Sequence, residues 1–224
     1  MTTKLARPTL FDFNGVLVDD EHVHFEAFRD VLAGVGIVLD EARYMERYLG
    51  FDDAGAFRAI LADAGQAASE PRVTALIEAK KPAYLTRIEV SLRVFPGDAS
   101  LVRRRAALAQ VAIVSGALRH EIDLCLGRMD VAGAVSFIVA AEDTRACKPD
   151  PEGYLLAKRR LGAVGERAVV IEDSLAGVEA AKAAGLRCVA VAHSYAADRL
   201  LAAGADAVFA ALADVTDAAL EGDS

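Results

Sequence analysis

Acidic residues end two short apolar runs that lie far apart in this chain. Asp12 closes the first run, Glu172 and Asp173 close the second, and Lys148-Pro149 lies between them. Carboxylates at the ends of strands lie at the sheet edge where open α/β folds bind ligands. Mg²⁺ prefers hard oxygen ligands. A rigidly held aspartate, a lysine and a distant acidic pair therefore indicate phosphate chemistry with a magnesium ion.

Strands and helices alternate around these residues, mainly after residue 110. Short apolar, often β-branched runs predict strands at 9–12, 111–115, 137–140, 168–172 and 187–191. Helices are predicted between them at 118–126, 151–161 and 175–184, with a start signal at Asp150-Pro151 and an end signal at Gly185. Apolar strands separated by helices imply a parallel sheet covered on both faces, a Rossmann-like α/β fold.

A helical segment interrupts this alternation after the first strand. Residues 20–92 have helical periodicity and almost no strand signal, as in the apolar spacing from Ala54 to Ala64 before Gly65. Phe95-Pro96-Gly97 is a turn signal at the point where the chain would return from this segment to the sheet. We therefore predict a Rossmann-like core of residues 1–18 and 95–224, and an inserted α-helical cap of residues 19–94.

Composition excludes several classes of protein. Hydrophobic residues make up 54% of the 224, yet no apolar run reaches the ~18 residues of a membrane span. The first residues lack the apolar core of a signal peptide, and the net charge of −8 disfavours nonspecific nucleic-acid binding. The three cysteines are odd in number and widely spaced, so each is expected to be reduced and to pack. We expect a cytoplasmic monomer or small homo-oligomer.

The order of four motifs resembles the haloacid dehalogenase superfamily, in the branch with a helical cap after the first strand. In chain order the motifs are matched by residues 12–16 (DFNGV), Ser115-Gly116, Lys148-Pro149 and Glu172-Asp173. Taken singly, such residues are more often turns, helix caps or surface charges. All four at strand ends, in this order, favour the functional interpretation. The resemblance covers nearly the whole chain.

The resemblance implies a nucleophile and a metal site. Asp12 would attack phosphorus and form an aspartyl-phosphate, which divides one difficult step into two easier ones. Asp12, the backbone carbonyl of Asn14, and Asp173 would bind Mg²⁺. Glu172 would orient a metal-bound water or support the ligands from outside.

The resemblance also implies phosphate contacts. Ser115 and the Gly116 N–H would donate hydrogen bonds to the phosphate, and Lys148 would neutralise its charge and keep Asp12 ionised. His24 matches a histidine that is common at this position in capped relatives, near the acid/base residue, and so joins the substrate contacts. His24 could equally be an ordinary hinge or packing residue.

Asn14 departs from the family pattern, which has an aspartate there that protonates the leaving group. An amide cannot transfer a proton, and general acid–base catalysis is typically worth ~10²–10⁴-fold. Three explanations stay open. Another group, such as Asp20, Glu21, His22 or His24, could supply the proton; the protein could bind its ligand with little turnover; or Asn14 could be a deliberate change that traps substrate.

The predicted cap carries further charged residues. Asp52 and Asp53 are predicted to cap the helix that follows them. Arg58, Lys80 and Lys81 could contact substrate, although a solvated helix face is the simpler interpretation. Lys80 and Lys81 are also the candidates for the Schiff-base lysine that a phosphonatase would require.

These features predict a magnesium-dependent phosphohydrolase of a small phosphorylated metabolite, with Asn14 at the acid/base position. A phosphosugar mutase resembling β-phosphoglucomutase is the enzymatic alternative. A phosphate-binding pseudoenzyme or a substrate-trapping variant is the alternative without turnover. A dehalogenase is less favoured, because those enzymes need no metal and Glu172-Asp173 resembles a metal site.

Overall fold

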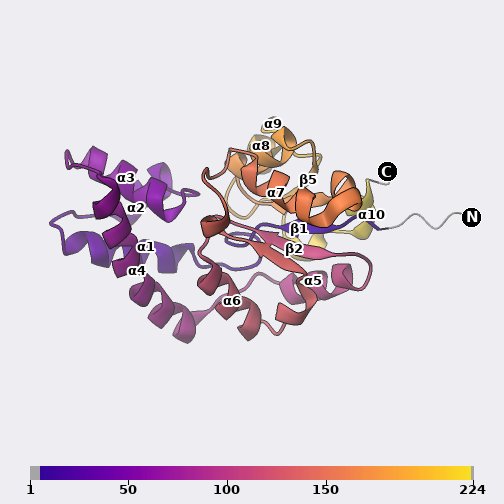
Figure 1. The fold of residues 1–224 in the computed structure, drawn as a ribbon, viewed down its shortest axis with the longest axis horizontal. Helices are drawn as coiled ribbons and strands as arrows, with labels where there is room; N and C mark the ends of the chain where they lie inside the picture. The colour runs from indigo at the N-terminus through magenta and orange to yellow at the C-terminus, as the bar shows by residue number, and fades with distance from the viewer. Residues whose placement is uncertain (1–5, 223–224) are drawn as a thin grey trace, which may run out of the picture. The chain divides into compact units, whose positions relative to one another are not determined.

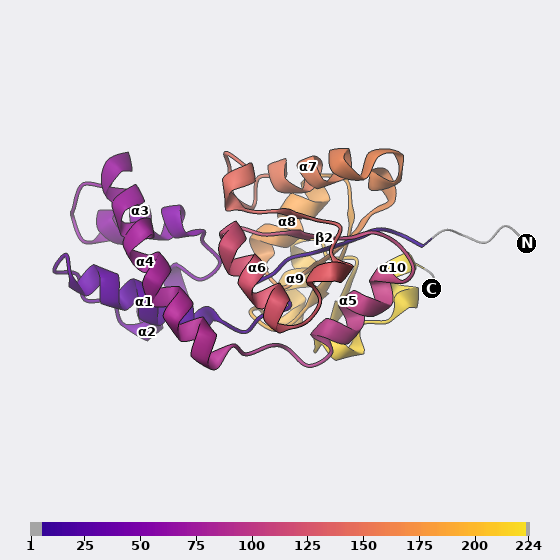
Figure 2. The same ribbon diagram turned by 60° about the horizontal axis from the view of Figure 1, so that its bottom comes forward.

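The computed structural model describes residues 6–222, which divide into two compact units (Figures 1 and 2). The core unit consists of the described residues up to Val18 and those from Val94 onward, and the helical unit consists of Asp19–Arg93. The chain leaves the core unit after Val18 and returns to it at Val94, and an antiparallel bridge joins these two residues. Beside it, the Asp19 N–H donates to the Arg93 carbonyl at 3.0 Å.

The core unit is built on a six-stranded parallel sheet with the order β3-β2-β1-β4-β5-β6. Its strands are β1 (Thr9–Phe11), β2 (Val111–Val114), β3 (Phe137–Val139), β4 (Val169–Glu172), β5 (Arg187–Val191) and β6 (Ala207–Phe209). β1 is central. β2 and β3 follow on one side of it, and β4, β5 and β6 follow on the other. The ends of β1 and β4 therefore flank the point where strand order reverses, which is where such sheets bind ligands.

Helices cover both faces of this sheet. They are α5 (Asp98–Ala106), α6 (Arg119–Arg128), α7 (Glu152–Leu161), α8 (Leu175–Ala183), α9 (Ala197–Ala202) and α10 (Asp217–Glu221). α7 and α8 lie on the opposite side of β1 and β2 from α5 and α6 (Figure 1). Leu10 and Val170 pack with Tyr154 of α7 and Val178 of α8 in one buried cluster. A sheet covered on both faces explains why its strands are continuous apolar runs.

The predicted elements of the core are confirmed. Every predicted strand is present with its ends within one residue, and the three predicted helices end within two residues of their predicted bounds. Asp150 Oδ1 accepts from the Glu152 N–H at 2.9 Å, and Gly185 ends α8 with a φ of +74°. β6 was not predicted, because its three half-buried residues begin an alanine-rich apolar run, 207–213, that has no strand alternation.

The helical unit contains α1 (Glu21–Ala33), α2 (Glu41–Arg47), α3 (Asp53–Asp63) and α4 (Glu70–Ser91). Buried apolar side chains of these helices, such as Phe28, Phe57 and Leu76, form one cluster. Asp52 Oδ1 accepts from the Gly55 N–H at 2.9 Å, which confirms its predicted role as the cap of α3. Within residues 6–222, no helix is both long and apolar enough to cross a membrane.

Lys80 is the main correction in the helical unit. Its side chain is fully buried rather than on a solvated face. The ammonium group donates to Asp53, lies 2.7 Å from His24 Nδ1 and sits 4.4 Å from the centre of the Phe28 ring. Lys81, one position on, turns outward and pairs with Glu78. The sequence pattern did not separate these neighbouring lysines, because a paired buried cation and a solvated one look alike in a run of helical residues.

The cysteines give a second, smaller correction. Cys125 and Cys188 are buried thiols outside any disulfide, as expected of packing residues, whereas Cys147 is an exposed thiol. Cys147 lies in the irregular segment before Lys148 rather than in a strand or helix. The packing role predicted for it is therefore wrong.

Candidate active site

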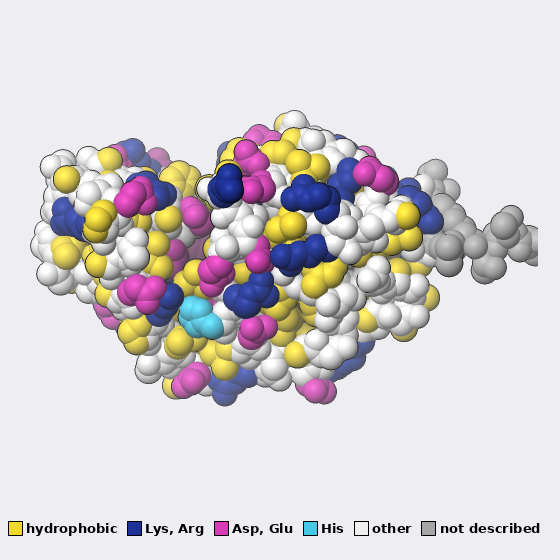
Figure 3. All heavy atoms as spheres, in the orientation of Figure 1, with side chains coloured by type: hydrophobic (Ala, Val, Ile, Leu, Met, Phe, Trp, Pro, Cys, Tyr) yellow, Lys and Arg dark blue, Asp and Glu magenta, His cyan; other side chains and the backbone are white. Residues whose placement is uncertain are grey.

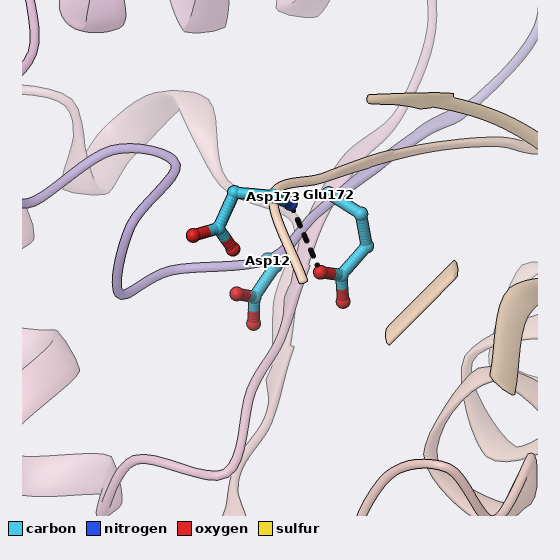
Figure 4. A group of neighbouring side chains, drawn as sticks. All are labelled: Asp12, Glu172 and Asp173. Carbon is cyan, nitrogen blue, oxygen red and sulfur yellow. Dashed lines mark hydrogen bonds between the residues drawn. The ribbon is translucent and has the colours of Figure 1, made fainter. Parts of the chain in front are cut away.

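Three carboxylates meet at the carboxyl ends of β1 and β4. Asp12 follows β1, Glu172 is the last residue of β4, and Asp173 comes next. One oxygen of each lies within 4.8 Å of the others, and all three side chains are buried. Figure 4 shows the three side chains next to one another. The structure thus brings together residues that the sequence separates by about 160 positions.

The pleat of the two strands accounts for this convergence. Phe11 is paired with Ile171 in the parallel register, so Asp12 and Glu172 come side by side one residue further on. Side chains alternate along a strand. Leu10 and Val170 face the cluster beneath α7 and α8, so Asp12 and Glu172 face the same way.

Lys148 joins the two strand-end carboxylates. Its ammonium group donates to Asp12 Oδ1 and to Glu172 Oε1, each at 2.6 Å, and to the Val114 carbonyl at 3.2 Å. Three acceptors match the three donors of an ammonium group. The Tyr154 hydroxyl adds a bond of 2.8 Å to the same Glu172 oxygen.

The cluster carries more negative charge than its lysine balances. Burial raises the pKa of Asp12 and the nearby Glu172 raises it further, so that despite Lys148 it reaches about 7. Burial, then the charges of Glu172 and Asp12, raise the pKa of Asp173 well above its ordinary value. Burial would lower the pKa of Lys148, but the two carboxylates outweigh burial and raise it. Three buried carboxylates around one cation fit a divalent metal ion, which would favour their ionised forms.

Two glycines make room for the acidic pair. A Cβ on Gly15, whose φ is +77°, would lie 2.0 Å from Asp173 Oδ2, and a Cβ on Gly177 would lie 1.8 Å from Glu172 Oε1. Gly177 stands in the first turn of α8, where its N–H donates to the Ser174 hydroxyl at 3.0 Å. The same hydroxyl donates to Glu172 Oε2 at 3.0 Å. The start of α8 therefore holds Glu172 in place.

Ser115 and Asn14 lie together beside the carboxylates. The Ser115 hydroxyl donates to Asn14 Oδ1 at 3.4 Å and accepts from the Ala117 N–H at 3.1 Å. Gly116 is exposed immediately after Ser115. The structure thus places the predicted phosphate-binding pair at the end of β2, next to β1, while the hydrogen bonds that they would give to phosphate remain predictions.

His24 belongs to the helical unit, where its ring is buried in a polar network. Its Nε2 lies 3.3 Å from Asp20 Oδ2, and its Nδ1 is within hydrogen-bond distance of Lys80. The Tyr84 hydroxyl donates to the same Asp20 oxygen at 2.5 Å. These contacts account for the position of His24 inside its own unit, and its role toward substrate remains a prediction.

Comparison with known proteins identifies the family. The model of the haloacid dehalogenase-like hydrolases matches residues 9–185, which contain all four motifs. The chain belongs to this family. Protein CbbY of Cereibacter sphaeroides is 32% identical over 217 residues, which cover 86% of this chain and 90% of CbbY. A phosphorylated carbohydrates phosphatase of Thermotoga maritima is 31% identical, with 83% of this chain and 85% of the relative covered.

A solved structure supports the same placement within the haloacid dehalogenase-like hydrolases. It is an Asp-to-Asn mutant of CbbY from Rhodobacter sphaeroides in complex with xylulose-1,5-bisphosphate, with a TM-score of 0.83 and 26% identity. The match covers 96% of this chain and 99% of that one. The predicted family, the Rossmann-like fold with a helical insertion and the enzyme class are confirmed: the chain is a phosphatase, a phosphoric monoester hydrolase, of this family.

Sequence reasoning missed three residues around the carboxylates. Tyr154 comes from the inner face of α7, and His193 and Ser194 come from the loop after β5. Ser194 donates to Asp173 Oδ2, and His193 Nδ1 lies 2.7 Å from the Gly15 carbonyl oxygen. None of the three is an acid at a strand end. The available signal was position alone, since β5 is adjacent to β4 and its end must lie near Asp173.

Proposed function

We propose that the chain is a magnesium-dependent phosphatase of a small phosphorylated sugar, acting through an aspartyl-phosphate on Asp12. One observation carries this proposal: Asp12 is buried at the end of the central strand, with Lys148 at 2.6 Å and two further carboxylates around it. The names of the relatives support the substrate class. One is a phosphatase of phosphorylated carbohydrates, and another was crystallised with a sugar bisphosphate.

In the proposed reaction an Asp12 oxygen forms a bond to phosphorus while the ester bond to the sugar oxygen breaks. The electron pair goes to the sugar oxygen, which takes up a proton from solvent as it leaves. Water then attacks phosphorus and gives up a proton to solvent, and the bond between phosphorus and the Asp12 oxygen breaks, which releases phosphate and regenerates the Asp12 carboxylate. Lys148 stays charged throughout and offsets the negative charge of the phosphate oxygens. Ser115 and the Gly116 N–H would hold those oxygens in place.

Asp12, the backbone carbonyl of Asn14, and Asp173 would hold Mg²⁺, with Glu172 supporting them. When bound, the ion supplies positive charge next to the phosphate. The cluster suits it, because the oxygens are close together and Gly15 leaves room for the Asp173 carboxylate beside Asp12.

Asn14 limits what this site can do on its own. An amide donates and accepts hydrogen bonds but transfers no proton. Substrates with poor leaving groups, such as sugar alkoxides, should therefore react slowly unless another group supplies the proton. Asn14 also favours a second candidate function, which is tight binding of a phosphorylated ligand without turnover.

Release of inorganic phosphate tests the proposal. The protein, Asn14→Asp and Asp12→Asn would each be given an aryl phosphate and a panel of pentose and hexose phosphates, with and without Mg²⁺. We expect slow, magnesium-dependent turnover of the aryl phosphate by the unaltered chain. Asn14→Asp should be faster by ~10²–10⁴-fold on sugar phosphates, and Asp12→Asn should be inactive.

Three other outcomes would count against the proposal in different ways. Phosphate release that survives Asp12→Asn would exclude Asp12 as nucleophile. An isomerised sugar phosphate without free phosphate, detected by phosphorus NMR, would indicate a mutase. Ligand binding with no turnover by either the unaltered chain or Asn14→Asp would favour the second candidate function, which is binding without turnover.

A further inference from the structure

The loop after β5 contacts both segments that would hold the metal ion. Ser194 donates from its hydroxyl to Asp173 Oδ2, and His193 Nδ1 lies 2.7 Å from the carbonyl oxygen of Gly15. Gly15 directly follows Asn14, whose carbonyl is a proposed ligand. Neither loop residue belongs to the four motifs, so the proposed mechanism assigns them no role.

Ser194 restricts the direction of the Asp173 carboxylate. Oδ2 of Asp173 lies against Gly15, so close that a Cβ there would be 2.0 Å away. The Ser194 hydroxyl donates to that same oxygen. With Oδ2 confined in this way, rotation of the carboxylate is limited, and Oδ1 keeps a defined direction.

His193 restricts the backbone next to Asn14. A carbonyl oxygen only accepts, so Nδ1 must carry the proton in this bond. The ring is held in turn by Phe95, with the two ring centres 3.8 Å apart and the planes 15° from parallel. The N–H of Gly15 donates to the Val18 carbonyl at 2.8 Å. Gly15 is thus anchored at both its nitrogen and its oxygen, which limits movement of the peptide group that precedes it.

We propose that His193 and Ser194 are positioning residues of the metal site, which orient the Asn14 carbonyl and the Asp173 carboxylate toward the ion. This inference rests on the proposed function, because it requires a divalent cation at the carboxylate cluster. Groups that orient metal ligands typically change metal affinity or activity by ~10–100-fold when removed. If this loop only anchored the fold, substitutions of His193 and Ser194 would change stability and leave the affinity for metal unaltered.

Matched variants separate the hydrogen bonds from the shape of the side chains. Ser194→Thr and Ser194→Val have nearly the same shape, and only threonine keeps a hydroxyl. His193→Asn keeps an N–H close to the position of Nδ1, whereas His193→Phe keeps a ring against Phe95 and has no donor. Ser100→Ala is the control, since it removes an exposed hydroxyl that donates to the Gly97 carbonyl at the start of α5.

The measurement is calorimetric titration of each metal-free variant with Mg²⁺ and with Mn²⁺, and the melting temperature of each variant without metal checks its fold. Ser194→Val and His193→Phe should bind both ions ~10–100-fold more weakly. Ser194→Thr and His193→Asn should lie closer to the unaltered protein, and Ser100→Ala should match it. In activity assays, the concentration of Mg²⁺ for half-maximal rate should rise in the weak binders, with the rate recovering at saturating Mg²⁺.

The possible failures are distinguishable. Equal affinity in the unaltered chain and Ser194→Val, or equal loss in Ser194→Val and Ser194→Thr, would overturn the positioning role. The proposed metal site would still stand if Asp173→Asn abolished binding. If the unaltered chain bound neither ion and released phosphate without them, the metal site and the positioning role would both be wrong.

Discussion

One lysine side chain bridges two buried carboxylates at the centre of this site. Lys148 bonds to Asp12 and Glu172 at the same distance, 2.6 Å. A buried charge is costly unless it is paired, and removal of one partner leaves the others uncompensated. Lys148 therefore controls the ionisation of Asp12 as well as the charge available to a phosphate.

We predict that Lys148→Met raises the pKa of Asp12 above its value of about 7, because the main influence that lowers that pKa is lost. Carbon-13 NMR titration of the aspartate carboxyl groups in metal-free protein measures the change. Phosphatase activity should fall, and its acidic limb should move to higher pH. Lys158→Met is the control, since Lys158 bonds to the Ala184 carbonyl and pairs with Glu166. An unchanged titration of Asp12 in Lys148→Met would contradict this account.

At the scale of elements, the start of α8 and the end of β4 form one structural piece. Glu172 occupies the space beside Gly177, and the cap hydroxyl of Ser174 bonds to both of them. The helix start thus determines the position of an acidic residue on the preceding strand. Small changes in the first turn of α8 should reach the metal site through this contact.

Gly177→Ala tests that coupling, with Gly127→Ala as its matched control. A Cβ on Gly177 would lie 1.8 Å from Glu172 Oε1, whereas a Cβ on Gly127, inside α6, would meet no atom within 4 Å. We expect Gly177→Ala to lower the free energy of unfolding by ~1–3 kcal/mol, as overpacking usually does. Gly127→Ala should raise it by ~0.4–1 kcal/mol, because alanine reduces the entropy of the unfolded chain.

Urea denaturation of both glycine variants measures the two effects. Gly177→Ala should also weaken the binding of Mg²⁺, since the Glu172 oxygen that Lys148 and Tyr154 contact must shift. Equal stability changes in the two variants would show that Glu172 has room to adapt.

The elements that carry the motifs were predictable because each has a local signal. The runs before Asp12 and Asp173 are short and apolar, and the parallel register then brings their ends together. The supporting residues were not predictable in this way. Tyr154 lies on an ordinary helix face and Ser194 in an ordinary loop, and only the packing of the chain places them against carboxylates. Lys80 was misassigned for the same reason, because its burial depends on side chains from other helices.

At the scale of the whole molecule, the carboxylate cluster links stability to pH and metal. Asp12 and Asp173 have pKa values raised above the ~3.9 of an unfolded aspartate. The folded protein therefore holds protons more strongly than the unfolded chain between those values. Stability from this source is fully present only at low pH and decreases as pH rises from about 4 to about 7.

We predict that metal-free protein loses stability through this cluster as pH rises from about 4 to about 7, by at most ~1.4 kcal/mol per pH unit for each proton released. Mg²⁺ should restore the loss at pH 7 and have less effect at pH 5, where protons compete for the carboxylates. Urea denaturation at several pH values, with Mg²⁺ or with a chelator, gives both trends. Asp173→Asn should flatten the dependence on pH, and a variant as pH-dependent as the unaltered protein would refute the link.

The bridge between Val18 and Val94 has a consequence for how such a protein can change over time. The two ends of the helical segment are tied together by this bridge and by the bond from Asp19 to Arg93. Because the two ends of the helical segment are adjacent, the segment connects its neighbours in the core unit as a short turn would, whatever its length. The entropic cost of closing a loop rises only slowly with added residues. Segments of different length and sequence could therefore replace one another at this position. The helical unit could then vary without redesign of the strands that support the carboxylates.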